Sequence, residues 1–171
     1  MAEAGSRPIL GYWPIRAGPR GNINRHILYL KGVDFEDKRY DMGSQEWPSA
    51  KQTLGLDFPN LPYLIDGDLR ISESKAVIQY ICEKWAPELL GADVGEKGRV
   101  LMLLNVLSDA FMAPIGMTFK TDAREEIITK AMEAFAPIAA CLGQNEYLVG
   151  SGVTLVDFLL WECVETILGL C

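Results

Sequence analysis

The sequence contains little histidine, and its cysteines are scattered and not grouped. It has one histidine, His26, and its four cysteines, Cys82, Cys141, Cys163 and Cys171, form no Cys-x-x-Cys pair and no spacing typical of a metal site. These absences argue against a metal centre and against a Ser-His-Asp or Cys-His enzyme. With no export signal in the sequence, we expect the thiols to be free in a reducing compartment.

Basic stretches and long apolar runs are missing too. No basic stretch is longer than Lys38-Arg39, and 23 acidic residues outnumber 16 basic ones to give a net charge of −7, so a nucleic-acid-binding protein is not expected. Residues 1–8 hold no apolar run and predict no signal peptide. The most apolar segment, 153–171, is interrupted by three acidic residues, which argues against a membrane span. The sequence predicts a soluble protein.

What the sequence does have is apolar content: 49% of its 171 residues are hydrophobic, enough for one ordinary domain or two small ones. The elements expected in its first part are a strand at 8–12, a helix at 23–30, a strand at 35–40, a hairpin at 63–71 and a helix at 72–85. The hairpin is predicted from the turn Asp66-Gly67, and Ser72 is expected to cap the helix after it. Glycine and proline predict that residues 43–60 are irregular.

Beyond Pro87 only helices are expected. They are predicted at 94–119, at 122–142 and from residue 153 onward. The apolar stripe of the second of these is expected to include Ile128, Met132 and Ile138. Thr154 and Asp157 form a capping box at the start of the third.

The pattern therefore predicts an α/β unit over residues 1–86 and an all-α unit over residues 87–171, an α+β chain overall. The last helix is unusual, because 11 of the 16 residues from Leu155 to Leu170 are apolar and they surround the helix. A helix that is apolar on all sides needs neighbours on all sides. We expect either a partner or a C-terminal continuation to cover it, and we favour the continuation.

Three segments carry a resemblance to a known family. They are Gly11-Tyr12-Trp13-Pro14-Ile15-Arg16, the block from Trp47 to Ser74 with its core Pro59-Asn60-Leu61-Pro62-Tyr63, and residues 153–159. Together they closely resemble the mu class of cytosolic glutathione transferases, over nearly the whole chain. The resemblance implies a thioredoxin-like, glutathione-binding domain at 1–86 and an all-α domain at 87–171 that shapes the electrophile pocket. Because the family continues past the last helix, it implies that the second domain is truncated here.

The resemblance assigns the catalytic role to Tyr12. In the family the matching tyrosine donates its hydroxyl to the glutathione sulfur. A thiol with a pKa of about 8.5 is mostly protonated at neutral pH, and lowering that pKa by roughly two units takes about 2.7 kcal/mol. One hydroxyl hydrogen bond with helix N-terminal dipoles can supply this. The alternative is a tyrosine that only packs at a strand end. A redox relative would carry cysteine near this position, so thiol–disulfide exchange is not expected.

The family's other site residues map onto this chain one by one. The resemblance implies glutathione binding by Tyr12, Trp13, Trp47, Lys51, Asn60, Leu61, Glu73 and Ser74, with Asp109 contributed by the partner subunit of a homodimer. The Trp13, Trp47 and Lys51 cluster would bind the glycine carboxylate, since indole N–H and ammonium groups suit an anion. Ser74 and the helix N-terminus would bind the γ-glutamyl carboxylate, and Glu73 its ammonium.

The cysteinyl part of glutathione would pair with the backbone of Leu61, in a turn closed by a cis bond to Pro62, and Asn60 would support that loop. Each of these residues also has an ordinary structural interpretation. The tryptophans would be partly buried aromatics, Glu73 a first-turn helix residue, and Asp109 part of a solvated helix face.

The chain departs from the mu pattern at several positions. Ser44 stands where the pattern has an arginine, which removes one carboxylate partner, and Glu73 replaces a glutamine. The loop between Arg16 and Arg25 is longer than in the pattern. The family's electrophile-site tyrosine would fall at Phe119 or Lys120, and neither supplies a phenol.

The predicted function is a cytoplasmic, homodimeric glutathione transferase that conjugates the glutathione thiolate to small hydrophobic electrophiles. Glutathione is the co-substrate, and no cofactor, metal, nucleic acid or membrane partner is expected. The alternative is a non-catalytic glutathione-transferase-like protein with a ligand-binding, lens-type or scaffold role. Retention of Tyr12, Trp47 and Ser74 favours the enzyme. Loss of the arginine at Ser44 and the truncated end favour the alternative.

Overall fold

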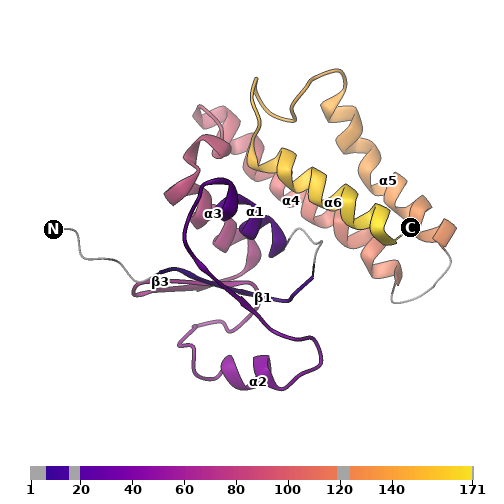
Figure 1. The fold of residues 1–171 in the computed structure, drawn as a ribbon. Coiled ribbons are helices and arrows are strands. Elements are labelled where there is room, and N and C mark those ends of the chain that lie inside the picture. Colours follow the sequence, from indigo (N-terminus) through magenta and orange to yellow (C-terminus); the bar gives the residue numbers. More distant parts are fainter. Residues whose placement is uncertain (1–6, 16–19, 119–123, 171) are drawn as a thin grey trace. The chain divides into compact units, whose positions relative to one another are not determined.

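The chain forms two compact units, residues 1–86 and 87–171. The computed structural model describes residues 7–15, 20–118 and 124–170 (Figure 1).

The first unit is a four-stranded mixed sheet with helices. Its elements are β1 Ile9–Tyr12, α1 Asn22–Leu30, β2 Glu36–Arg39, α2 Glu46–Ala50, β3 Tyr63–Asp66, β4 Leu69–Ser72 and α3 Ser74–Trp85. The strand order is β2-β1-β3-β4, with β1 parallel to β2 and the other two pairs antiparallel. Helices α1 and α3 lie on one face of the sheet and α2 lies on the other (Figure 1). This is the α/β unit that the sequence predicts.

The alternation of side chains along β1 produces two cores. Leu10 is fully buried and pairs in register with the fully buried Leu64 of β3. Because successive strand side chains point to opposite faces, Leu10 and Tyr12 share one face, while Trp13 points to the other. There Trp13 packs against a second cluster built on Tyr40, Leu56 and Tyr63.

Two expectations for this unit are wrong. Residues 43–60 are not wholly irregular, since they contain the helix α2. Its Pro48 is tolerated because the first turn of a helix needs no intrahelical N–H partner. Ser72 does not cap α3, because it ends β4 and donates its hydroxyl to the carbonyl of Phe58. The residue before α3 is instead Glu73, with φ of 72°.

The hairpin is confirmed, with its turn displaced by one residue. The register pair Asp66–Leu69 closes a two-residue loop, so the turn is Gly67-Asp68 and not Asp66-Gly67. Gly67 has φ of 60°, a left-handed conformation that costs glycine nothing.

Among the described residues of the second unit, the regular elements are all helices. They are a short 3-10 helix, Pro87–Leu90, followed by α4 Val94–Thr118, α5 Arg124–Leu142 and α6 Leu155–Leu170. Helix α4 packs against both α5 and α6. By length and composition alone, α4 is the one helix among the described residues that could cross a membrane.

The apolar stripe of α5 is only partly where the sequence predicts it, since Ile138 is buried but Ile128 and Met132 are not. The buried side chains are Ile127, Ala131 and Ile138, and Met132 is 70% exposed. Ile127 and Ala131 are four residues apart, so the buried face lies one residue earlier along this part of the helix.

The capping box of α6 is confirmed. Oδ2 of Asp157 accepts from the backbone N–H of Thr154 at 2.8 Å and from its hydroxyl at 2.9 Å. Oδ1 of the same carboxylate accepts from the N–H of Leu148 at 2.9 Å. One side chain thus ties the start of α6 to the loop that precedes it.

Candidate active site

The topology gathers the predicted site residues of the first unit at one end of its sheet. Register pairs join Gly11 of β1 to Tyr63 of β3, and Tyr63 to Ser72 of β4. Tyr12 is the last residue of β1, and Glu73 follows Ser72, the last residue of β4. Although β3 lies between these two strands, both residues lie at the same end of the sheet. The start of β3, which follows the Leu61-Pro62 turn, lies at this end of the sheet as well.

Tyr12 is enclosed on the α1 side of the sheet. Its side chain is 6% exposed, and its ring packs so closely on Gly21 that a Cβ there would lie 2.1 Å from a ring carbon. Burial raises the pKa of the Tyr12 hydroxyl, and the positive charges of Arg20 and Arg25 oppose part of that rise. The phenol therefore keeps its proton at neutral pH and can act as a hydrogen-bond donor.

Arg25 is a residue that sequence reasoning missed. Its guanidinium carbon lies 5.7 Å from the centroid of the Tyr12 ring, and its Nε donates to Oδ1 of Asp37 at 2.7 Å. Arg25 is 3% exposed, and within the described chain its Nη2 is buried without a hydrogen-bond partner. A buried guanidinium beside the phenol stabilises negative charge near it. Nothing in the apolar spacing of α1 distinguishes Arg25, since the interaction depends on the Asp37 side chain of β2.

The predicted carboxylate-binding tryptophans belong to one aromatic cluster. The Trp47 ring stacks on that of Tyr63 with centroids 6.1 Å apart, and meets the Tyr40 ring edge-on at 5.3 Å. Trp13 packs against the same cluster. The structure therefore brings Trp13 and Trp47 together, and half-buried Lys51 directly follows α2, the helix that carries Trp47.

Ser44 has a local role in this region. Its hydroxyl donates to the carbonyl of Asp41 at 2.9 Å and accepts from the N–H of Glu46 at 3.3 Å. It shapes the turn into α2, and its short side chain cannot supply the charge of the arginine that the mu pattern has there.

The cis bond between Leu61 and Pro62 is confirmed. Beside it, Oδ1 of Asn60 accepts from the N–H of Leu61 at 2.9 Å, and Nδ2 of Asn60 donates to Oε1 of Glu73, also at 2.9 Å. Ser74 is the first residue of α3, where helix N–H groups have no intrahelical acceptor. The structure thus brings Asn60, Leu61, Glu73 and Ser74 together.

The remaining predicted residues lie elsewhere. Asp109 is in the second unit, on α4, with an exposed side chain. Phe119 and Lys120 fall outside the described residues. Among the described residues, no group of three or more His, Cys, Asp or Glu side chains could hold a metal ion.

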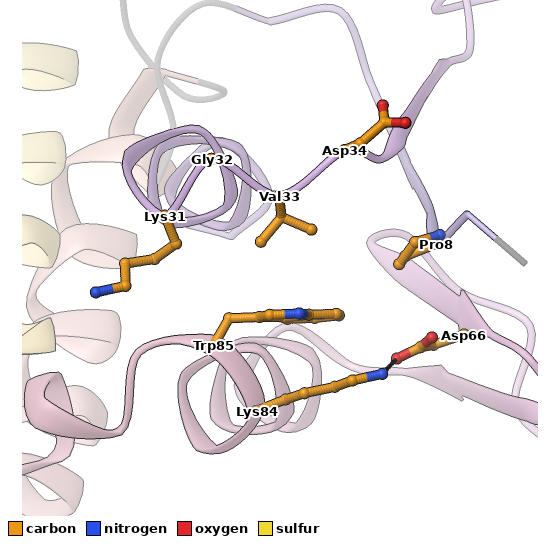
Figure 2. A pocket seen from close by; sticks show the side chains of 8 residues that line it. All are labelled: Pro8, Lys31, Gly32, Val33, Asp34, Asp66, Lys84 and Trp85. Carbon is orange, nitrogen blue, oxygen red and sulfur yellow. Dashed lines mark hydrogen bonds and ion pairs between the residues drawn. The ribbon is translucent and has the colours of Figure 1, made fainter. Parts of the chain in front are cut away.

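A separate hollow of about 460 Å³ lies at the opposite end of the first unit (Figure 2). It is lined by Pro8, Lys31, Gly32, Val33, Asp34, Asp66, Lys84 and Trp85. Pro8 precedes β1, Asp66 ends β3 and Trp85 ends α3, so these elements separate the hollow from Tyr12. Lys84 is paired with Asp66 in its wall. The hollow is not part of the candidate active site.

Comparison with known proteins identifies the family. Residues 8–83 match the family model described as "Glutathione S-transferase, N-terminal domain", and residues 103–168 match "Glutathione S-transferase, C-terminal domain". The chain belongs to the glutathione S-transferase family.

Curated relatives of this chain are also glutathione S-transferases. A "Glutathione S-transferase" of Tyrophagus putrescentiae is 35% identical over 164 residues, which cover 92% of this chain and 73% of the relative. "Glutathione S-transferase Mu 4" of Mus musculus is 36% identical over 165 residues, covering 91% of this chain and 74% of the relative. Because these relatives are glutathione S-transferases, the chain is identified as a transferase.

Solved glutathione S-transferase structures share the fold. A C. elegans glutathione S-transferase matches with a TM-score of 0.79 at 20% identity, covering 95% of this chain and 82% of that one. The Ascaris lumbricoides glutathione S-transferase matches with a TM-score of 0.78 at 25% identity, covering 96% and 82%. The predicted fold class, a thioredoxin-like domain followed by a helical domain, is confirmed.

Proposed function

We propose that this glutathione S-transferase is mu-like, cytoplasmic and homodimeric, and that it conjugates glutathione to small hydrophobic electrophiles. The observation that carries the proposal is the buried Tyr12 phenol on the last residue of β1, at the same end of the sheet as the Leu61-Pro62 turn and the start of α3. The raised pKa of Tyr12 keeps the hydroxyl protonated, and Arg25 adds a fixed positive charge beside it.

Tyr12 is the proposed catalytic residue. The glutathione thiol loses its proton to solvent, and the Tyr12 O–H donates a hydrogen bond to the resulting thiolate. The sulfur lone pair then forms a bond to an electrophilic carbon. In a substitution, the leaving group departs with the electron pair of its bond to that carbon. The chain's contribution is to favour the thiolate over the thiol, since only the thiolate is a good nucleophile.

The rest of glutathione would meet groups of matching charge. Trp13, Trp47 and Lys51 would bind the glycine carboxylate, and the backbone of Leu61 would pair with the cysteinyl backbone. In this proposal glutathione is a co-substrate and the reaction needs no further cofactor.

At the other end of the tripeptide, Ser74 and the N-terminus of α3 would bind the γ-glutamyl carboxylate, because helix N–H groups favour an anion. Glu73 and, from the partner subunit, Asp109 would bind the γ-glutamyl ammonium. Both carboxylates complement that positive charge.

A turnover assay tests the proposal. The parent and a Tyr12→Phe variant are mixed with glutathione and a chromogenic aryl halide at neutral pH. Loss of one hydrogen bond worth about two pKa units predicts a roughly 10- to 100-fold lower rate for the variant. Equal turnover by the two proteins would reject the role of Tyr12. No turnover by a parent that still binds glutathione would favour the non-catalytic alternative.

A further inference from the structure

The side chain of Asn60 joins two segments that are separate in sequence. Its Oδ1 accepts from the N–H of Leu61, and its Nδ2 donates to Oε1 of Glu73, each at 2.9 Å. One planar amide therefore spans from the cis Leu61-Pro62 turn to the residue that precedes α3. Asn60 and Glu73 are exposed, and the two bonds engage the oxygen and the nitrogen of one amide, which favours one orientation of its plane.

Glu73 is unusual in its backbone and in its lack of a capping role. Its φ of 72° lies in the left-handed region that non-glycine residues seldom adopt, and its side chain makes no capping bond to α3. A helix N-terminus does not itself hold a carboxylate chain in one rotamer, and a glutamate loses considerable rotamer entropy when it is fixed. The Asn60 amide engages Oε1 and leaves Oε2 able to meet a cation.

We propose that Asn60 is a positioning residue that acts through Glu73, holding the carboxylate in the orientation that receives the γ-glutamyl ammonium of glutathione. The inference rests on the proposed function, in which Glu73 binds that ammonium. Asn60 then determines how strongly the enzyme prefers a tripeptide with a free amino group. Its role is preorganisation, because part of the entropic cost of ordering Glu73 is met before the ligand arrives.

A double comparison tests this role, in which the amino group is removed from the ligand and the amide side chain is removed from the protein. Dissociation constants are measured by calorimetry for glutathione and for the analogue in which hydrogen replaces the γ-glutamyl amino group. Each ligand is tested on the full chain and on Asn60→Ala. We expect Asn60→Ala to weaken glutathione binding about tenfold and analogue binding less than about twofold, because the analogue has no ammonium for Glu73 to meet.

Equal loss for both ligands would overturn the proposal, since it would mean that Asn60 only supports the Leu61 turn. Asn145→Ala, a matched change in the loop before α6, is expected to leave both constants unchanged. A parent that does not prefer glutathione over the analogue overturns the Glu73 assignment itself. A parent that binds neither ligand instead contradicts the proposed function, so the failures are distinguishable.

Asn60→Ser addresses an Asn60→Ala protein that fails to fold. The serine hydroxyl can still accept from the N–H of Leu61, but the side chain is too short to donate to Oε1 of Glu73. We expect Asn60→Ser to weaken glutathione binding more than analogue binding, as Asn60→Ala does. Equal loss for the two ligands in Asn60→Ser would contradict the proposal.

Discussion

Tyr12 lies between two opposing influences. Burial raises the pKa of its hydroxyl, while the positive charges of Arg20 and Arg25 pull it down. The first influence keeps the proton that a hydrogen-bond donor needs, and the second stabilises a negative charge placed near the phenol. A thiolate at this point would benefit from both. Arg25 can fill this role because Asp37 holds its Nε at 2.7 Å while its Nη2 is left buried without a partner in the described chain.

Replacing Arg25 by Gln should change the pH dependence of the reaction. Removal of the positive charge raises the pKa of the bound thiol, so the acid limb of kcat/KM should move to higher pH. We expect a loss of about tenfold at neutral pH, recovered as the pH rises. The pH–rate profile checks this.

Arg39→Gln is the matched control for that change. Arg39 also pairs with Asp37, at 2.7 Å, but its side chain is 54% exposed. Removal of the Arg39 charge should leave the pH–rate profile unchanged. A shift of equal size in both variants would show that the effect comes through Asp37 and not from a charge beside Tyr12.

At the scale of elements, the cluster around Tyr40 and Tyr63 connects α2 to the sheet. Helix α2 has no buried residue of its own, so the ring of Trp47 stacked on Tyr63 is a principal contact of this helix. The hydroxyls of Tyr40 and Tyr63 lie 2.8 Å apart in the buried interior, and burial with this bond raises the pKa of Tyr63. The position of Trp47 and Lys51 therefore depends on this aromatic pair.

A double-mutant cycle measures that pair. Tyr40→Phe leaves the Tyr63 hydroxyl buried without its partner, which should lower the free energy of unfolding by about 1–3 kcal/mol. Tyr40→Phe/Tyr63→Phe removes both polar groups and should recover most of this loss. Urea denaturation of the two single variants and the double variant gives the coupling energy. Strictly additive effects would contradict the assigned hydrogen bond.

The elements show what the sequence can and cannot predict. Strands, the hairpin and the capping box were predictable because they depend on alternation, turn residues and local spacing. Helix α2 was missed because its five residues are too few for a periodic signal, and Pro48 reads as a breaker. Ser72 was given a capping role by its residue type, but its hydroxyl bonds to Phe58, fourteen residues earlier in the chain, which no local pattern reveals.

The candidate site also contains residues that the sequence could predict and residues that it could not. Tyr12, the cis turn at Leu61 and the start of α3 were identified through a resemblance that the family comparison supports. Arg25 and the Asn60–Glu73 bond were not identified, because each joins segments that only the folded sheet brings together. The stripe of α5 was partly misplaced because Met132 is apolar yet exposed, so composition alone did not locate the buried face.

Helix α4 carries apolar side chains that are exposed on one of its faces. Met102, Val106 and Asp109 are spaced as i, i+4 and i+7 and lie on one side of the helix. Met102 is 54% exposed and Val106 41% exposed. The proposed homodimer would cover these side chains and bring Asp109 to the partner's glutathione site.

Charge placed on this face should prevent dimerisation. We expect Met102→Glu/Val106→Glu to be monomeric where the parent is dimeric, because burying two carboxylates against an apolar surface is costly. Light scattering after size-exclusion chromatography measures the mass. Met132→Glu, an exposed apolar position on α5, is the control and should leave the dimer intact. A dimer that survives both changes would place the interface elsewhere.

If the Tyr12 hydroxyl stabilises the glutathione thiolate, the pKa of the bound thiol must depend on that hydroxyl. The ultraviolet absorbance of the thiolate is titrated in complexes of glutathione with the parent and with Tyr12→Phe. We predict a pKa about two units below that of a free thiol in the parent, and a value close to that of the free thiol in the variant. The same pKa in both complexes would contradict the account.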